Sequence, residues 1–433
     1  MKKVKEVINE FVRQGVNKKT KISSFLLFVF GLLKSDWRNY KIAPVKWMDY
    51  EKISKKGLLE TKNNSISVGP KYIGSNKNII SKLEVPELYY RVFDDGQISA
   101  NSSSVFLNDE ILIEKVGNGE QKRFNYSGGQ IKMHGDTYAL VNCKNPKKIE
   151  CGIFLGGNGA FNYYHWLIEI VPKFKYLNDL PSNLKRYPLL IPDYARDISS
   201  FAEILKIVSK GWQVIYLKPN DLYVVNKLVY IDTPNNLPFN LFGNNRFKVN
   251  DFLFRTDSLE YLRRTFLREI SSEVESCSSY PDKIFLARKK SDNKRQYNQD
   301  EIKAQLEGFG FKSVCLETLS FKQQVEIMNH AEWVVGPTGA AWTNIVFARE
   351  GTKCLCWMAE QYGEFSAFSN IAANVGVDIK YLTINTPVHH TRYLYLQNYL
   401  IDTLAIERAL LSMGLFAKGQ ALDINQKSIS MSE

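Results

Sequence analysis

The chain has 433 residues, about three times the length of a typical domain, so we expect two or three domains and exclude a single small scaffold. Hydrophobic residues make up 44% and charged residues 24%, a composition that excludes a wholly disordered protein. The 57 Lys and Arg against 45 Asp and Glu give a net charge of +12. This excess favours a polyanion, an anionic membrane face or a phosphorylated ligand as partner, without choosing among them.

Residues 1–40 form a basic helical extension in our interpretation. They hold nine bases and three acids, so they carry +6, half of the net charge of the chain. The basic stretch from Lys2 to Lys21 leads into the apolar run from Phe25 to Leu33. This pattern suits an interfacial helix on anionic lipid, and the alternative is a helix pair packed on the protein body. The run is shorter than the ~20 residues that cross a bilayer, and no small-residue cleavage site follows it, so we expect neither a spanning helix nor a signal peptide.

Residues 41–240 are expected to form the first, acceptor-side domain. Short apolar runs separated by tight turns predict antiparallel or irregular strands as far as Asn145. Strands then alternate with helices, and residues 233–250 are interpreted as a linker or surface loop. The expected strands are 150–155, 187–191, 213–217 and 222–231, with helices at 162–177 and 198–209.

Residues 250–390 contain a second alternating block, which follows a helix at 258–274. Two such blocks predict two Rossmann-like domains that face each other across a cleft. Residues 391–433 are expected to form a long helix at 392–413 that returns to the first domain, and a loose tail after Lys418. The expected strands of the second block are 283–287, 312–316, 333–335, 352–357 and 379–382, with helices at 300–307, 321–330 and 339–348.

The first chemically informative segment is the expected helix at 162–177. Its apolar residues recur with helical spacing, so His165 and Glu169, four residues apart, share the other face. An imidazole oriented by a carboxylate is a reasonable general base. The alternative is a solvated pair on a surface helix.

Two later segments are suited to a diphosphate. Arg288 and Arg295 follow an expected buried strand, and a guanidinium can hold two phosphate oxygens at once. In the segment 333–344, Thr338 can cap the next helix, while Gly339 and Ala340 leave room for a phosphate at the backbone nitrogens. The alternatives are a solvated basic loop and an ordinary turn. Neither G-x-G-x-x-G nor G-x-x-x-x-G-K-[ST] occurs, which weighs against dinucleotide oxidoreductases and P-loop hydrolases.

Together, these segments resemble glycosyltransferase family 61, which includes transferases for capsular polysaccharides and xylan-type glycans. Two departures are Thr338, where many members have His, and Gln299, where Glu is common. The matches are Asn162, His165, Trp166, Glu169 and Pro172 in N-x-x-H-W-x-x-[DE]-x-x-P; Arg288, Arg295 and Asn298 in a strand-end Arg followed by R-x-x-N; Leu319, Ser320 and Gln324 in L-S-x-x-x-Q; and Gly336, Pro337, Gly339, Ala340, Thr343, Asn344 and Phe347 in G-P-x-G-A-x-x-T-N-x-x-F.

The resemblance implies an α/β, GT-B-like inverting transferase that moves a sugar from a nucleotide donor to a hydroxyl of a surface polysaccharide or a lipid-linked acceptor. It looks more like bacterial enzymes at the cytoplasmic membrane, so we expect a cytoplasmic protein, peripheral on the inner membrane face. By this resemblance His165 and Glu169 are catalytic; Arg288, Arg295, Asn298, Thr338, Gly339, Ala340, Asn344 and Glu360 bind the donor; and Asn158, Asn162 and Trp166 lie on the acceptor side.

No D-x-D pair occurs in the sequence, so we expect no metal site and no cofactor, with protein cations in place of Mn²⁺ or Mg²⁺. The rival hypothesis is a non-catalytic membrane-associated scaffold or nucleotide-sugar-binding protein of the same fold. A nucleic-acid binder is least favoured, because the surplus bases lie largely in the first forty residues rather than in a stripe interleaved with aromatic residues.

Overall fold

The computed structural model describes residues 39–48, 55–115, 117, 119–272, 280–289, 295–394 and 396–415. The expected basic extension therefore lies outside the described residues, apart from residues 39 and 40, and so does the tail after Lys418. Among the described helices, none combines the length and the hydrophobicity that crossing a membrane requires.

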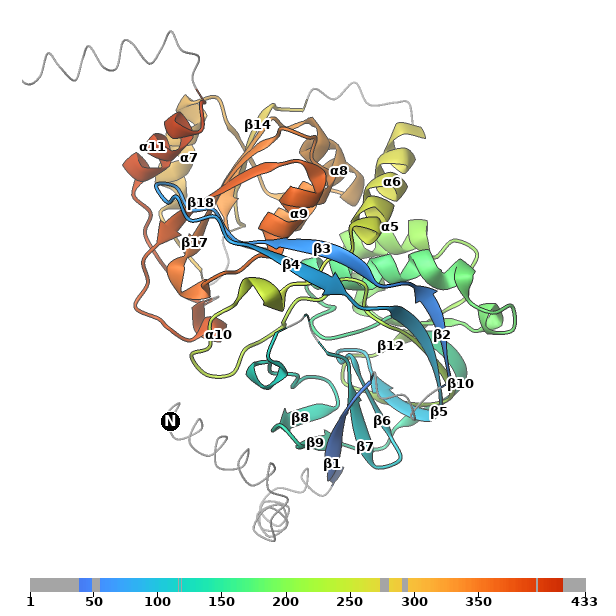
Figure 1. Ribbon diagram of the computed structural model, residues 1–433. Coiled ribbons are helices and arrows are strands. Elements are labelled where there is room, and N and C mark those ends of the chain that lie inside the picture. The colour runs from blue at the N-terminus through green and yellow to red at the C-terminus, as the bar shows by residue number, and fades with distance from the viewer. Residues whose placement is uncertain are drawn as a thin grey trace, which may run out of the picture.

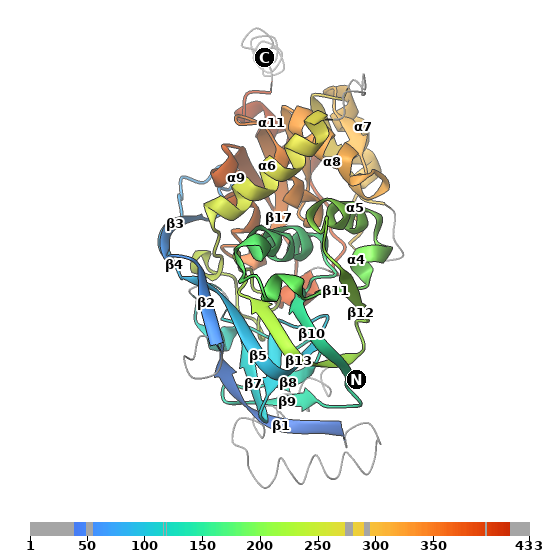
Figure 2. The same cartoon turned by 90° about the vertical axis from the view of Figure 1, so that its right-hand side faces the viewer.

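The fold is mixed α/β, with one large sheet and one smaller sheet (Figure 1). Four neighbouring strands of the eleven-stranded sheet are parallel, as the alternating pattern after residue 145 predicts. Figure 2 shows β10 and β13 beside β5, where the sheet changes to antiparallel pairing. The parallel strands are β12 (Val214–Leu217), β11 (Leu189–Pro192), β10 (Lys147–Phe154) and β13 (Leu222–Ile231).

The rest of the large sheet comes from the N-terminal part of the chain, where short strands are expected. Here β5, β6 and β7 pair in sequence order and β8 pairs with β9, whereas β1 lies between β7 and β9 and β2 pairs with β5. The strands are β1 (Tyr40–Trp47), β2 (Lys55–Glu60), β5 (Leu88–Ser99), β6 (Ser104–Leu107), β7 (Glu110–Ile113), β8 (Ile131–His134) and β9 (Tyr138–Asn142). The helices that go with this sheet are η2 (Gln121–Arg123), α3 (Tyr163–His165), η3 (Trp166–Ile170), η4 (Val171–Asp179), η5 (Leu184–Arg186), α4 (Tyr194–Asp197) and α5 (Ser199–Val208).

The smaller sheet has five strands, all parallel. Strand β16 is buried along its whole length and β17 after its first residue, as expected for a parallel sheet covered on both faces. In spatial order the strands are β15 (Lys312–Val314), β14 (Lys283–Leu286), β16 (Trp333–Pro337), β17 (Lys353–Ala359) and β18 (Asp378–Ile384). The associated helices are α7 (Gln299–Gly308), η7 (Leu316–Thr318), α8 (Phe321–His330), η8 (Ala340–Phe347), η9 (Glu360–Tyr362) and α9 (Ala367–Val375).

Two segments of the chain join the two sheets. The hairpin of β3 (Asn63–Val68) and β4 (Ile80–Val85) reaches toward β18, and Tyr72 forms a parallel bridge with Tyr381 (Figure 1). Helix α6 (Thr256–Ser272) packs against η4 as well as η8, α8 and α9. One continuous hydrophobic core therefore includes residues of both sheets.

The expected linker or surface loop at 233–250 is wrong for its first part only, because residues 243–246 are exposed. Residues 231–238 are buried, and the segment continues into η6 (Val249–Asp251). It passes close to the ends of β10 and β13, so its polar side chains contribute to the interior.

The expected helix at 392–413 is wrong as well. It is broken into α10 (Thr391–Leu394) and α11 (Thr403–Ser412), and α11 packs on α7 and β18 rather than returning to the larger sheet. The chain between them is held by Asn298, whose side chain donates to the carbonyl of Ile401 at 2.9 Å and accepts from its N–H at 3.0 Å.

Candidate active site

The segment from Tyr163 to Asp179 is helical, but it is not one α-helix. Asn162 caps it by accepting from the N–H of Tyr164 at 2.9 Å, after which one α turn passes into the π turn η3 and the 3₁₀ helix η4. The change coincides with Pro172, which has no N–H to give to the carbonyl of Ile168. The side-chain amide of Asn235 donates to the Ile168 oxygen instead, at 2.8 Å.

His165 and Glu169 form a buried pair within this segment. The exposed fractions of the two residues are 6% and 8%, which excludes the solvated alternative. Nδ1 of His165 is hydrogen-bonded to Oε2 of Glu169, and Oε1 of Glu169 accepts from the N–H of Leu237 at 2.8 Å. A carboxylate that accepts a hydrogen bond from Nδ1–H favours the tautomer in which Nε2 is the basic nitrogen.

Apolar groups position the imidazole on its other sides. Its ring centroid lies 5.4 Å from that of Phe239 and 5.6 Å from that of Tyr164. Gly159 has a φ of +71°, and a Cβ there would lie 2.8 Å from Cδ2 of His165. The glycine turn before the helix therefore allows the backbone to approach the ring closely.

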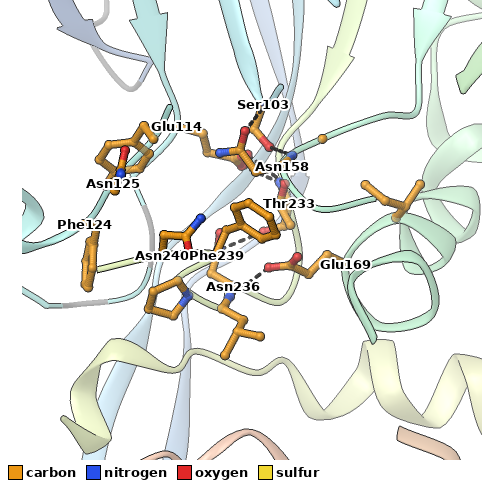
Figure 3. A pocket seen from close by; sticks show the side chains of 15 residues that line it. Ser103, Glu114, Phe124, Asn125, Asn158, Glu169, Thr233, Asn236, Phe239 and Asn240 are labelled. Carbon is orange, nitrogen blue, oxygen red and sulfur yellow. Dashed lines mark hydrogen bonds between the residues drawn. The ribbon is translucent and has the colours of Figure 1, made fainter. Parts of the chain in front are cut away.

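Glu169 also lines a small polar cavity, shown in Figure 3. Its volume of about 20 Å³ is room for about one water molecule. Opposite Glu169 lies Glu114, which accepts from the hydroxyl of Thr233 at 2.7 Å and from that of Tyr230 at 2.8 Å. Asn158 lines the same cavity, with its N–H donating to Oγ of Ser103 at 3.0 Å.

Sequence reasoning missed Glu114, Thr233 and Asn236 in this cavity. The available signal was the polar run from Asp232 to Asn236 directly after β13, because ligands of open parallel sheets bind beyond the carboxyl ends of strands. The three expected acceptor-side residues have different surroundings in the structure. Asn158 lines the cavity, Asn162 caps the helix, and Trp166 is fully buried and stacked on Phe201.

A second cavity, of about 730 Å³, lies at the carboxyl ends of β14 and β16. Arg288 follows β14 and donates from Nη2 to the carbonyl of Thr338, while its Nη1 is buried without a hydrogen-bond partner among the described residues. Gln299 accepts from the N–H of Arg288 at 2.7 Å and returns a bond to its carbonyl at 3.0 Å. Arg295, Gly339 and Ala340 also line this cavity.

Helix η8 starts at this cavity, but not as expected. Its N-cap is Gly339, without a side-chain cap, so Thr338 is not the capping residue. The N–H of Thr338 is bound to the carbonyl of Trp357 at 2.9 Å. The next backbone N–H groups open a 3₁₀ helix and have no acceptor within it. The N–H of Thr338, which the sequence pattern assigns to the donor, is therefore already bound to a backbone carbonyl.

Three further residues from the expected donor set lie elsewhere. Asn298 is bound to the backbone of Ile401, and Asn344 is 1% exposed and accepts from the hydroxyl of Tyr163 at 2.8 Å. Glu360 lies on another, open cavity of about 1410 Å³. The Tyr163–Asn344 bond joins the helix of His165 to η8, which begins at the cavity of Arg288.

Within the described ranges, no three His, Cys, Asp or Glu side chains converge as a metal site would require. Residues 163–355 match the family model described as Glycosyltransferase 61. This range includes His165, Glu169, Arg288 and Gly339. No protein with a curated description matches the sequence.

Proposed function

We propose that this chain, whose glycosyltransferase 61 domain indicates a glycosyltransferase, transfers a sugar from a nucleotide donor to a hydroxyl with inversion at the anomeric carbon. The acceptor is a growing surface polysaccharide or a glycolipid. The observation that carries the proposal is the buried His165–Glu169 pair, held on a helical segment that is hydrogen-bonded to η8, the helix that begins at the cavity of Arg288.

We propose a single in-line displacement. Nε2 of His165 takes the proton of the acceptor hydroxyl, and the acceptor oxygen bonds to the anomeric carbon as the bond from that carbon to the diphosphate oxygen breaks. Glu169 holds the ring and stabilises the imidazolium that forms. The cavity beside Glu169 is small, so the acceptor binds with some opening of the segment around Phe239.

The donor is assigned to the cavity at the ends of β14 and β16, with a GT-B-like arrangement of the two sheets. There Arg288, Arg295 and the first N–H groups of η8 would stabilise the leaving diphosphate. Nη1 of Arg288 supports this assignment, because a buried guanidinium nitrogen that has no hydrogen-bond partner among the described residues favours an anionic ligand. With these cations in place we propose a reaction independent of metal, and a protein held at the inner membrane face by its basic first 40 residues.

The experiment is a thermal-shift screen against nucleotide sugars, followed by nucleotide diphosphate release with and without acceptors. We expect His165→Ala to lower transfer about 10²–10⁴-fold while the donor still stabilises the fold. His389→Ala, at an exposed histidine, is the matched control. Donor binding without turnover under any condition would favour the rival binding protein.

A further inference from the structure

Three aromatic side chains meet beyond the carboxyl ends of three parallel strands of the larger sheet. Phe161 comes after β10, Tyr194 after β11 and Phe239 after β13. These strands are neighbours in the order β11, β10 and β13, so their carboxyl ends lie side by side. Ligands of open parallel sheets bind at this edge. The aromatic cluster therefore lies where a ligand of this sheet is expected.

Phe161 is the most exposed member of the cluster. Its ring centroid lies 6.5 Å from that of Tyr194 and 6.0 Å from that of Phe239, and each pair of rings meets at 87°. Neither neighbour is stacked parallel on Phe161, and the residue is 50% exposed. The ring is thus held by two edge contacts and still presents apolar surface to solvent.

Phe239 connects this apolar surface to the proposed base. Its ring centroid lies 5.4 Å from that of His165, on which it also packs edge-on. The turn at Gly159 fits closely around both rings, since a Cβ there would lie 2.6 Å from Cδ2 of Phe239 and 2.8 Å from Cδ2 of His165. A ligand that covers Phe161 therefore lies close to His165.

Amide side chains border the aromatic cluster. Asn158 and Asn240 line the same cavity as Phe239 (Figure 3). Asn101 accepts from the hydroxyl of Tyr194 at 2.9 Å. An amide has both donors and an acceptor, which suits ligand hydroxyls, because these also donate and accept. Aromatic surface bordered by such groups matches a sugar ring, which has an apolar C–H face and polar hydroxyls at its rim.

Resting on the function proposed above, we propose that Phe161 is the platform on which the acceptor binds, and that the acceptor unit is a pyranose ring. The C–H face of the sugar stacks on Phe161, and one of its hydroxyls reaches Nε2 of His165 beside Phe239. A phosphate head group or a serine hydroxyl has no flat C–H face. The cluster therefore selects a saccharide as the acceptor.

Saturation-transfer difference NMR on the full chain tests this proposal without a donor. The probes are methyl glycosides of the common hexoses and pentoses. When the aromatic protons of the protein are saturated, we expect transfer to the C–H protons on one face of at least one glycoside. Phe161→Ala should raise the dissociation constant of that glycoside about tenfold, because one aromatic contact is lost. Phe161→Trp should keep the wild-type binding.

Leu58→Ala is the matched control, because Leu58 on β2 is 51% exposed and lines neither the cavity of Glu169 nor that of Arg288. Phe161→Leu keeps an apolar side chain without a ring, and it serves if Phe161→Ala does not fold. We expect it to weaken binding as well. The proposal is overturned by a wild type that shows no transfer to any glycoside, by equal dissociation constants in the wild type and a folded Phe161→Leu protein, or by equal weakening in Leu58→Ala.

Kinetics in an active preparation separate this proposal from the proposed transfer. Phe161→Ala should raise the KM for the acceptor about tenfold, with a smaller change in the KM for the donor. An increase confined to the donor KM overturns the role of Phe161. If no nucleotide sugar is turned over, the proposed transfer fails, whereas glycoside binding still decides whether Phe161 is a saccharide platform.

Discussion

Arg288 is the residue whose position at a strand end corresponds most directly to the sequence expectation. It follows β14, and its side chain donates to the carbonyl of Thr338, the residue directly after β16. The backbone of Arg288 is clamped by Gln299. The guanidinium is thus held before any ligand arrives, which lowers the entropy lost on binding.

We expect Arg288→Ala to weaken binding of a nucleoside diphosphate about 10- to 100-fold, the equivalent of one or more charge-assisted hydrogen bonds. Isothermal titration with uridine, guanosine and cytidine diphosphates measures this. Lys312→Ala is the control, because that exposed lysine on β15 of the same sheet does not line the cavity. Equal dissociation constants for Arg288→Ala and the wild type would remove Arg288 from the diphosphate site.

Glu169 shows what residue spacing can and cannot predict. The spacing of four residues predicts contact with His165, and the contact is present. Burial of the pair depends on Leu237 and Phe239, which come from a segment that lacks periodicity in the sequence. Such long-range contacts leave no local pattern, so the pair is indistinguishable from a solvated one by sequence alone.

At the scale of elements, the strands of both parallel regions could be predicted closely because their apolar runs are short and bounded by turn residues. The helices could be predicted less accurately than the strands. The segment from Tyr163 has the apolar spacing of an α-helix, but Pro172 and a carbonyl bound by Asn235 give it π and 3₁₀ turns. Expected helix 392–413 is interrupted because Tyr399 stacks on Tyr297, a contact that local propensity does not contain.

Asn235 therefore controls the shape of the element that carries the proposed base. It is 0% exposed, donates to Ile168 and accepts from the N–H of Arg255 and the hydroxyl of Ser258, each at 2.8 Å. Asn235→Ala would leave these buried groups without a partner, at about 1–3 kcal/mol for each group that water does not reach.

We expect Asn235→Ala to lower the free energy of unfolding by about 2–4 kcal/mol and to reduce turnover beyond what lost folding explains. Urea titration and activity at a temperature where both proteins are folded measure these effects. Asn226→Ala is the control, because its amide bonds Glu150 at the exposed surface. Similar losses in the two variants would show that Asn235 has no special role in the helix.

At the scale of the molecule, the hydrophobic core extends across both sheets. Residues of both sheets share one hydrophobic cluster, and α6 packs against helices of each. Strand β3 is also fixed to α9, a helix packed on β18 of the second sheet, where Asn370 accepts from the N–H of Val68 at 2.6 Å. Sequence patterns identify the sheets but not this shared interior, because packing between distant segments is not periodic.

We therefore expect the chain to unfold in one cooperative thermal transition. Phe154→Ala, which removes a fully buried ring from the larger sheet, should cost about 3–5 kcal/mol and lower the temperature of the whole transition. Differential scanning calorimetry measures this, with equal calorimetric and van't Hoff enthalpies as the criterion. Phe161→Ala, at a half-exposed ring, should shift the transition less. Two resolved transitions, with only one displaced by Phe154→Ala, would show that the two sheets unfold separately.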